Sequence, residues 1–451
     1  MSESEVSKLS LNVMIDKEKS KVLFAEANGH VIDVLLSFLT LPLGKIVKIL
    51  ENHYGNQAPV IGSLTTLYRG LFKLDRSHFC TGGAKQMLLN PTSSFEDECR
   101  RLKLDITEAK PTKYFVCENA KCPNSRGSNV SMYSDISKCD CGKPLNREVV
   151  VVDRLASDGG GVFTIKSSSF VICDDLRVVP IESGYIQTLN NIGITDTDGA
   201  EFKRLSLGVD DIVDLLKFAL IFPTPLTDFV FKNSHMRGST TEESEPKVEA
   251  EPELLLHLID RGGNISTSMK KIMLKIFLKK SSNSFLFAQA SDEFVEFLLS
   301  LLVVPLGGVE FLLGGNTCLK NIDNLYRSVT DFIDDKYFRS PHTKSRLINP
   351  KLPHGYISEN QFLPLGEEDP PDYITRIGGM GSGMKGFLTR EKGICMALSV
   401  CFLNRKGVPL SDVEEMVLQI SPNDALGILK ASLTSTAALT DSLIDPMLQK
   451  R

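Results

Sequence analysis

Four cysteines within one short stretch have the residue type and spacing that bind a metal ion. Cys117 and Cys122 form a C-x4-C pair, sixteen residues follow, and Cys139 and Cys141 form a C-x-C pair. Two such pairs on two turns supply the four thiolates that tetrahedral zinc prefers, each about 2.3 Å from the ion. Gly142 suits a turn whose backbone N–H groups point at sulfur. The pattern therefore predicts one zinc ion held by all four thiolates.

The same cysteines allow two other interpretations. They could be free thiols on a polar loop, although unpaired cysteine is usually a buried residue, or Cys139 and Cys141 could form a redox pair. A site with four cysteine ligands is closed, so the expected role of a zinc ion is structural. The chain has no cysteine between Asn349 and Gly393. We therefore expect the metal only in the first part of the chain.

The cysteines must be positioned by the residues on either side of them. Lys113–Val116 and Arg147–Val152 are rich in apolar and β-branched residues, and we expect them to form two strands. The metal would pin these strands together. The stretch 112–153 is thus predicted to be a zinc-ribbon-like insert.

A glycine-rich loop from Gly379 to Gly386 contains the spacing G-x-G-x-x-G. A dinucleotide site also needs a strand before this motif, a helix after it and an acid about 20 residues further on. The flanking residues are poor in strand and helix formers. Lys385 is followed by glycine, whereas a phosphate-binding loop has serine or threonine there. We interpret the stretch as a flexible glycine turn.

The remaining polar residues give weak catalytic candidates. His78 and Cys80 are two residues apart, a spacing at which side chains do not face each other on a helix. The acid pairs Asp174–Asp175 and Asp210–Asp211 are explained by positions at a strand end and a helix start. We therefore predict no catalytic residue and no organic cofactor, and an enzyme is the less favoured class.

Two blocks of sequence recur in the same order. The stretch 23–44 matches the stretch 286–307 at a constant offset of 263 residues; one copy ends Leu-Pro-Leu-Gly and the other Val-Pro-Leu-Gly. Near the end of each part, 215–228 matches 428–441. Repetition of two blocks in one order predicts an internal duplication of one unit.

An acidic segment separates the two predicted units. The chain has 451 residues and a net charge of −5, and the stretch 239–254 carries six acids and one base, so the rest of the chain is balanced. Such a polar stretch with two prolines is typical of a disordered linker. We predict a first unit at 1–238 and a second at 255–451. The sequence leaves open whether the units pack together.

Each unit is expected to be α+β. In the first, Leu11–Ile15 and Lys21–Ala27 are predicted to form a hairpin, and the apolar spacing of 31–50 indicates a helix that Pro42 should break. Val209–Ile221 has the pattern of an amphipathic helix, and Phe170–Ile181 that of a strand. The composition, 42% hydrophobic and 24% charged, is typical of globular proteins and excludes global disorder.

The chain is expected to be soluble and intracellular. Residues 1–10 show no apolar signal region. The stretch Phe294–Leu313 is long enough to span a bilayer, but two acids and a Pro–Gly–Gly break favour a buried helix and a turn. We predict a cytoplasmic location with reduced thiols, and a nuclear one stays open.

The repeated blocks also resemble a known family. The sequence resembles the plant-specific family catalogued as domain of unknown function six hundred and seventy-four. The stretches that carry this resemblance are Phe24–Ala27, Leu41–Gly44, Leu67–Tyr68, Lys85–Leu89 and Cys139–Lys143. The resemblance covers nearly the whole chain. It implies a plant source and a tandem architecture, and it brings no established activity. The second unit departs from the pattern by lacking the cysteines.

Three functions are consistent with these patterns. The favoured one is an interaction or scaffold protein with a structural zinc site, whose two tethered units would gain avidity for protein partners not identified by the sequence. The alternative is an enzyme with a ligand site between the two units, using Lys385. The third is weak, zinc-dependent nucleic-acid binding. The stretch 114–152 has only five bases against four acids, so the sequence gives no strong nucleic-acid signal.

Overall fold

The computed structural model describes residues 8–122, 130–136, 138–139, 141–149, 161–182, 184–232, 272–356, 361–368, 388, 403 and 405–449. The predicted acidic linker 239–254 and the glycine loop 379–386 lie outside these residues. The fold is mixed α+β, as expected, with helices and three antiparallel sheets. Among the described helices, none is long and apolar enough to cross a bilayer. Below, the first half means the described residues 8–232 and the second half 272–449.

The first half starts with the predicted hairpin. Strands β1 (Leu9–Asp16) and β2 (Lys21–Asn28) pair antiparallel, with alternating buried residues along β1. They lie in a five-stranded sheet of order β6-β5-β2-β1-β7. Its other strands are β5 (Ser169–Cys173), β6 (Val178–Pro180) and β7 (Ala200–Leu207).

The helix expected after the hairpin is broken at Pro42, as predicted. Helix α1 (Gly29–Ser37) begins at Asn28, whose side chain accepts hydrogen bonds from the N–H groups of residues 30 and 31. A short 3-10 turn, η1 (Phe38–Thr40), follows, and α2 (Leu43–Tyr54) starts directly after the proline. Proline fixes the extended backbone at this point and has no N–H to continue the helix. The remaining helices of this half are α3 (Gly62–Lys73), α4 (Gly82–Leu89), α5 (Glu96–Cys99), α6 (Tyr185–Asn191), α7 (Val209–Ile221) and α8 (Pro225–Val230).

One predicted strand is interrupted in the structure. The stretch expected as a strand over Phe170–Ile181 forms two strands, β5 and β6, joined by a turn. Leu176 has a positive φ of 60° there, and the N–H of Cys173 donates to the carbonyl of Arg177. Apolar residues on both sides of the turn hid it in the sequence.

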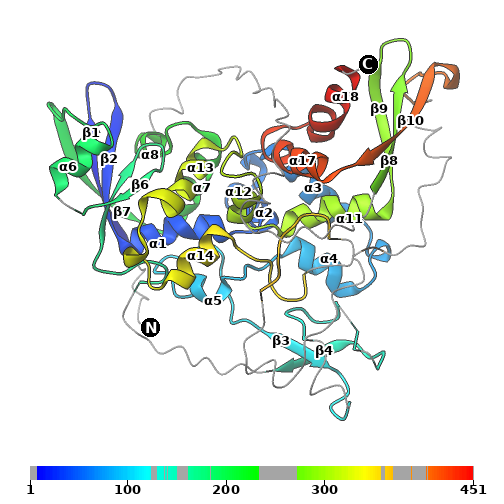
Figure 1. Ribbon diagram of the computed structural model, residues 1–451, viewed down its shortest axis with the longest axis horizontal. Coiled ribbons are helices and arrows are strands. Elements are labelled where there is room, and N and C mark those ends of the chain that lie inside the picture. Colours follow the sequence, from blue (N-terminus) through cyan, green and yellow to red (C-terminus); the bar gives the residue numbers. More distant parts are fainter. Residues whose placement is uncertain are drawn as a thin grey trace.

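The second half begins with the same order of elements, a hairpin followed by helices. It opens with the hairpin β8 (Ile272–Lys279) and β9 (Ser284–Ala290), which with β10 (Val413–Ile420) forms a sheet of order β10-β8-β9. Its helical elements are α11 (Asp292–Ser300), η5 (Leu301–Val303), α12 (Leu306–Leu312), α13 (Lys320–Arg327), η6 (Ser328–Phe332), η7 (Asp335–Tyr337), α14 (Pro341–Ile348), η8 (Leu410–Asp412), α17 (Pro422–Thr434), η9 (Thr440–Ile444) and α18 (Asp445–Gln449). Figure 1 shows the five-stranded sheet and the three-stranded sheet at opposite ends of the molecule, with helices between them.

The two hairpins correspond residue by residue. Strand β1 pairs with β7 from Leu9↔Leu207 to Asp16↔Ala200, and β8 pairs with β10 from Ile272↔Ile420 to Lys279↔Val413. Each hairpin has a register shift at the same place, between residues 14 and 15 and between residues 277 and 278. These positions differ by the offset of 263 residues that the sequence comparison found.

We call the interface between the two halves the seam. It includes reciprocal contacts between equivalent residues. The N–H of Leu43 donates to the carbonyl of Val304, and the N–H of Leu306 donates to the carbonyl of Leu41, each over 2.9 Å. Pro42 and Pro305 lie opposite each other at the centre of this pair. Reciprocal contacts between equivalent residues are the mark of a two-fold interface.

Helices also cross the seam in both directions. Helix α3 of the first half packs against α17 of the second, and the Ser63 hydroxyl donates to the carbonyl of Ser435 over 2.6 Å. Helix α13 packs against α7, and the Asn321 amide donates to the carbonyl of Phe222 over 2.6 Å. Buried residues of both halves form one continuous hydrophobic core. The halves are therefore packed together, and they lack the independent motion on which the avidity argument depends.

Candidate metal centre

The four predicted ligands lie on two loops of a small two-stranded segment. We call the described residues of 112–153 the ribbon. Strand β3 (Tyr114–Cys117) ends with the first ligand and pairs antiparallel with β4 (Leu145–Val149), which begins just after the last. The sequence had placed these strands at Lys113–Val116 and Arg147–Val152. The second strand starts earlier than expected because Leu145 pairs with Cys117, and residues 150–152 lie outside the described part of the chain.

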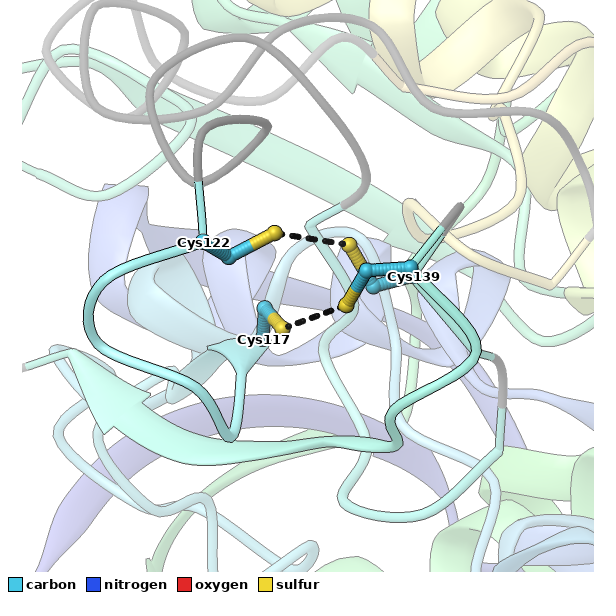
Figure 2. Close-up of side chains that lie close together, drawn as sticks. Cys117, Cys122 and Cys139 are labelled. Carbon is cyan, nitrogen blue, oxygen red and sulfur yellow. Dashed lines mark hydrogen bonds between the residues drawn. The ribbon is translucent and has the colours of Figure 1, made fainter.

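The structure brings all four sulfur atoms together. Their Sγ atoms lie within 4.8 Å of one another. The distance is 3.5 Å between Cys117 and Cys141, and 3.7 Å between Cys122 and Cys139. Figure 2 shows the three labelled side chains pointing inward from the two loops. Four sulfurs at about 2.3 Å from one tetrahedral ion lie about 3.8 Å apart, so the spacing fits a metal site; a disulfide would bring two sulfurs to about 2.05 Å.

Backbone turns hold the thiols in this arrangement. The N–H of Gly142 donates to the carbonyl of Cys139 over 2.7 Å, and the N–H of Cys139 donates to the carbonyl of Lys143 over 2.8 Å. Gly142 has a φ of +83°, a conformation that glycine adopts without strain. The glycine that follows the last cysteine in the sequence therefore closes the tight turn, as expected.

The turns also direct backbone N–H groups at sulfur. The N–H of Lys143 bonds the Cys141 sulfur and lowers the pKa of that thiol to about 7. Burial raises the pKa of the Cys139 thiol, although the N–H of Cys141 works against this effect. Burial likewise raises the pKa of Cys117. A bound cation would favour the thiolate form of each ligand, since thiols that coordinate a metal lose their protons.

The cluster is largely closed to solvent. Cys117, Cys122 and Cys139 are buried, and Leu145, which is fully buried, packs against them. Cys141 is the exposed member of the set. The guanidinium of Arg147 donates to the carbonyl of Cys117 over 3.1 Å and supports the turn at the end of β3. These donors could hold a metal, and the enclosure leaves little room for a substrate beside it.

The other sequence candidates have structural partners. The Cys80 thiol donates to the carbonyl of Leu388 across the seam over 2.7 Å. Both carboxylate oxygens of Asp174 accept hydrogen bonds from Thr227, and Asp211 accepts from the N–H of Gly208 at the start of α7. The strand-end and helix-start interpretations of these two acids are consistent with those contacts.

Sequence reasoning missed a buried acid cluster in the second half. Glu310 is fully buried and Asp323 nearly so; the hydroxyl of Thr317 lies 3.0 Å from one carboxylate and 2.6 Å from the other. Burial, and then the Asp323 carboxylate, raise the pKa of Glu310 well above its usual value. The only sequence signal for this cluster is an acid inside an apolar helix. Such an acid argues against a membrane span, but it does not reveal a second acid as its partner.

The described residues also line two surface cavities away from the cysteine cluster. One, of about 410 Å³, is lined by the first half, including Lys21, Cys173 and Arg177. The other, of about 300 Å³, lies between the halves, where Thr188 and Asn191 face Phe332. Lys385, on which the alternative interpretation relies, lies outside the described residues and lines neither cavity.

Comparisons with known proteins place the chain in a family. No curated protein and no solved structure matches it significantly. The profile of one family, described as "Protein of unknown function (DUF674)", matches residues 5–386. That match covers well over half of the chain, and it agrees with the resemblance found in the sequence. The chain belongs to the DUF674 family of proteins of unknown function.

Proposed function

We propose that this chain is a non-catalytic interaction or scaffold protein whose ribbon is held by a structural zinc ion. The observation that carries the metal assignment is the meeting of four cysteine sulfurs at tetrahedral spacing. Three of the four ligands are buried. A closed four-thiolate site leaves no position for substrate, so its contribution is to folding.

Zinc is favoured by the ligand chemistry. Four thiolates in a tetrahedron select zinc or iron, and a single closed site on two cysteine turns is typical of structural zinc. All eight cysteines in the described ranges are free thiols. Free thiols support a reducing compartment, and we propose the cytoplasm.

We also propose that the chain consists of two copies of one unit, at 1–238 and 255–451, with 239–254 as the linker. The equal strand registers and the two hairpin irregularities support the duplication, since they recur at the sequence offset. So do the reciprocal hydrogen bonds around Pro42 and Pro305. The cysteine ribbon belongs to the first copy.

The interaction role is supported by two edge strands, one in the sheet at each end of the molecule. Among the strands that the structure describes, β7 and β10 each form one edge of their sheet. Phe202 on β7 is 56% exposed and Val417 on β10 is 51% exposed. An extended segment of a partner can add to an exposed sheet edge through main-chain hydrogen bonds. Two such edges at opposite ends of one rigid body would let the protein hold two partner segments at a fixed separation.

A ligand site between the two halves is the second candidate. The cavity of about 300 Å³ between the halves favours it, because ligand sites concentrate at such interfaces. A thermal-shift screen with nucleotides and other metabolites tests it. Ligand at 100 times its dissociation constant would stabilise the protein by about 2.7 kcal/mol, a shift that is easily measured.

The metal assignment is tested by metal analysis of purified protein and two variants. We expect one zinc per chain in the wild type and in Cys318→Ser, whose thiol is exposed and lies outside the cluster. Cys139→Ser should lose most of the metal because three thiolates bind more weakly than four. Wild-type protein that contains no metal, and that melts at the same temperature with and without chelator, would end the proposal.

The interaction role has its own test. Proximity labelling in cells should recover the same proteins with the wild type and with Lys73→Ala, an exposed residue on α3 away from both edge strands. Phe202→Asp and Val417→Asp should reduce that recovery. If the wild type labels nothing above background, the scaffold proposal fails while the metal assignment stands.

A further inference from the structure

Tyr133 of the ribbon makes hydrogen bonds with the first half. Its hydroxyl donates to the carbonyl of Asn90 over 3.0 Å, and the N–H of Thr92 donates to its oxygen over 3.0 Å. Asn90 and Thr92 lie just after α4, outside the ribbon. The side chain of Tyr133 therefore ties the ribbon to the helical body.

The same hydroxyl also contacts the second half. The hydroxyl of Tyr356 donates to that of Tyr133, and the two rings meet edge to face with centroids 5.2 Å apart. Tyr356 is 1% exposed, and its oxygen lies 3.0 Å from the N–H of Thr92. Three segments, far apart in the sequence, thus share one small polar cluster at the seam.

Close backbone contacts surround this cluster on both sides. A Cβ atom on Gly83 would lie 2.4 Å from the carbonyl oxygen of Ser134, so the ribbon backbone rests directly on α4. On the other side, a Cβ atom on Gly355 of the second half, which has a φ of +90°, would lie 3.3 Å from the hydroxyl oxygen and 3.6 Å from the Cα of Ser131. Ile136 of the ribbon is buried in the common core. The stretch 130–136 is therefore docked on both halves at once.

This docked stretch is joined to the metal ligands at both ends. Ser131 exchanges two backbone hydrogen bonds, of 2.7 and 3.0 Å, with Phe115, two residues before Cys117. At the other end, the N–H of Asp135 donates to the carbonyl of Leu145, which packs on the buried cysteines. The position of Tyr133 is thus set by the same turns that hold the sulfurs.

The ribbon has little else to keep it folded. Its own hydrophobic cluster contains three buried residues, Tyr114, Val116 and Val130. A cluster of this size is too small to fold a segment by burial alone, and such modules normally depend on their metal.

We infer that the ribbon is a metal-dependent clasp, which closes one end of the seam by holding Tyr133 between the Asn90–Thr92 segment and Tyr356. Loss of the metal releases this end of the seam. The contacts around Pro42 and Pro305 remain, because they are fixed by the common core. The inference rests on the proposed metal site and extends it from stability of the ribbon to control of the contact between the halves.

Hydrogen–deuterium exchange on the full-length protein, with and without a zinc chelator, tests the clasp. Metal removal should speed exchange by roughly tenfold at the N–H of Thr92, the effect of losing about one hydrogen bond, because this N–H donates to the Tyr133 hydroxyl. Exchange at Leu43 and Leu306 should stay unchanged. Re-addition of zinc should restore the original rates.

Two variants separate the clasp from the metal. Tyr133→Phe keeps all four cysteines but removes the hydroxyl, so it should bind zinc normally and still show the faster exchange at Thr92. Tyr185→Phe, on α6 at the other side of the molecule (Figure 1), should behave as the wild type.

The possible failures are distinct. Wild-type protein without any metal would overturn the metal site and the clasp together. If the metal is bound, but chelation and Tyr133→Phe both leave exchange at Thr92 unchanged, the clasp is wrong and the structural metal site stands.

Discussion

At the scale of single residues, Glu310 is the most unusual group in the described chain. Its Oε2 atom is buried without a hydrogen-bond partner, and its other oxygen shares Thr317 with Asp323. Two carboxylates in contact away from water cannot both carry a charge without a large cost. A proton on Glu310, given toward Asp323, accounts for the arrangement. The position aligned with it in the first half is Val47, which needs no such proton.

This pair predicts an inverted pH dependence of stability. Because the pKa of Glu310 is raised on folding, the folded state holds a proton that the unfolded state releases above its ordinary pKa. The contribution to the free energy of unfolding is therefore full at low pH and falls as pH rises towards the folded pKa, by up to about 1.4 kcal/mol per pH unit. Denaturant unfolding from about pH 5 to about pH 8 measures it.

The matched variants are Glu310→Gln and Glu415→Gln. Glutamine at position 310 keeps a donor to Asp323 and cannot ionise, so this variant should gain stability relative to the wild type as pH rises. Glu415 is exposed on β10 and pairs with Lys275, so its variant should run parallel to the wild type. Equal pH slopes in all three proteins would contradict the shared proton.

The residue scale also shows how far sequence reasoning reaches. The cysteine spacing predicted the cluster because all four ligands lie within one short stretch, where local turns decide the geometry. Tyr133 gave no signal, because its partner Tyr356 is 223 residues away. Contacts over such separations depend on the packing of the whole chain and leave no periodic pattern.

At the scale of elements, proline and glycine decide the main boundaries. Pro42 and Pro305 each end a helical run and start the next helix, which is why the break was predictable. The hairpin and α7 also followed from local patterns. The split of the predicted 170–181 strand did not, because a turn with Leu176 in the left-handed region has no glycine to mark it.

Two glycines of α3 give a test of the helix crossing at the seam. Gly62 has a φ of +41°, and a Cβ there would lie 2.5 Å from the carbonyl oxygen of Ser432 on α17. Gly62→Ala should therefore lower the free energy of unfolding by about 1–3 kcal/mol through strain and overlap. Gly70, exposed on the same helix with open space around it, should gain about 0.5–1 kcal/mol when changed to alanine. Chemical denaturation compares them, and a neutral Gly62→Ala would show that α3 does not pack on α17 as described.

At the scale of the whole molecule, the two halves form one body. They share a hydrophobic core, and α3 packs on α17 of the second half while α13 packs on α7 of the first. The sequence predicted the duplication and left the packing open, because each half shows the same periodicity whether or not it has a partner. The reciprocal hydrogen bonds beside Pro42 and Pro305 show how the two halves contact each other.

This packing predicts that a covalent link through residues 239–254 is dispensable once the chain has folded. A protease site placed within 239–254 should allow cleavage into two fragments that still elute together in gel filtration. They should separate only in denaturant, since the core and the seam join them without the covalent link. Fragments that separate in native buffer would contradict the single body.

The central claim is that four thiolates hold one zinc ion and keep the ribbon in place. X-ray absorption at the zinc edge on the purified full-length protein tests it most directly. The account predicts four sulfur neighbours at about 2.3 Å and no nitrogen or oxygen ligand. A first shell with fewer sulfurs, or with oxygen or nitrogen at about 2.0 Å, would contradict it.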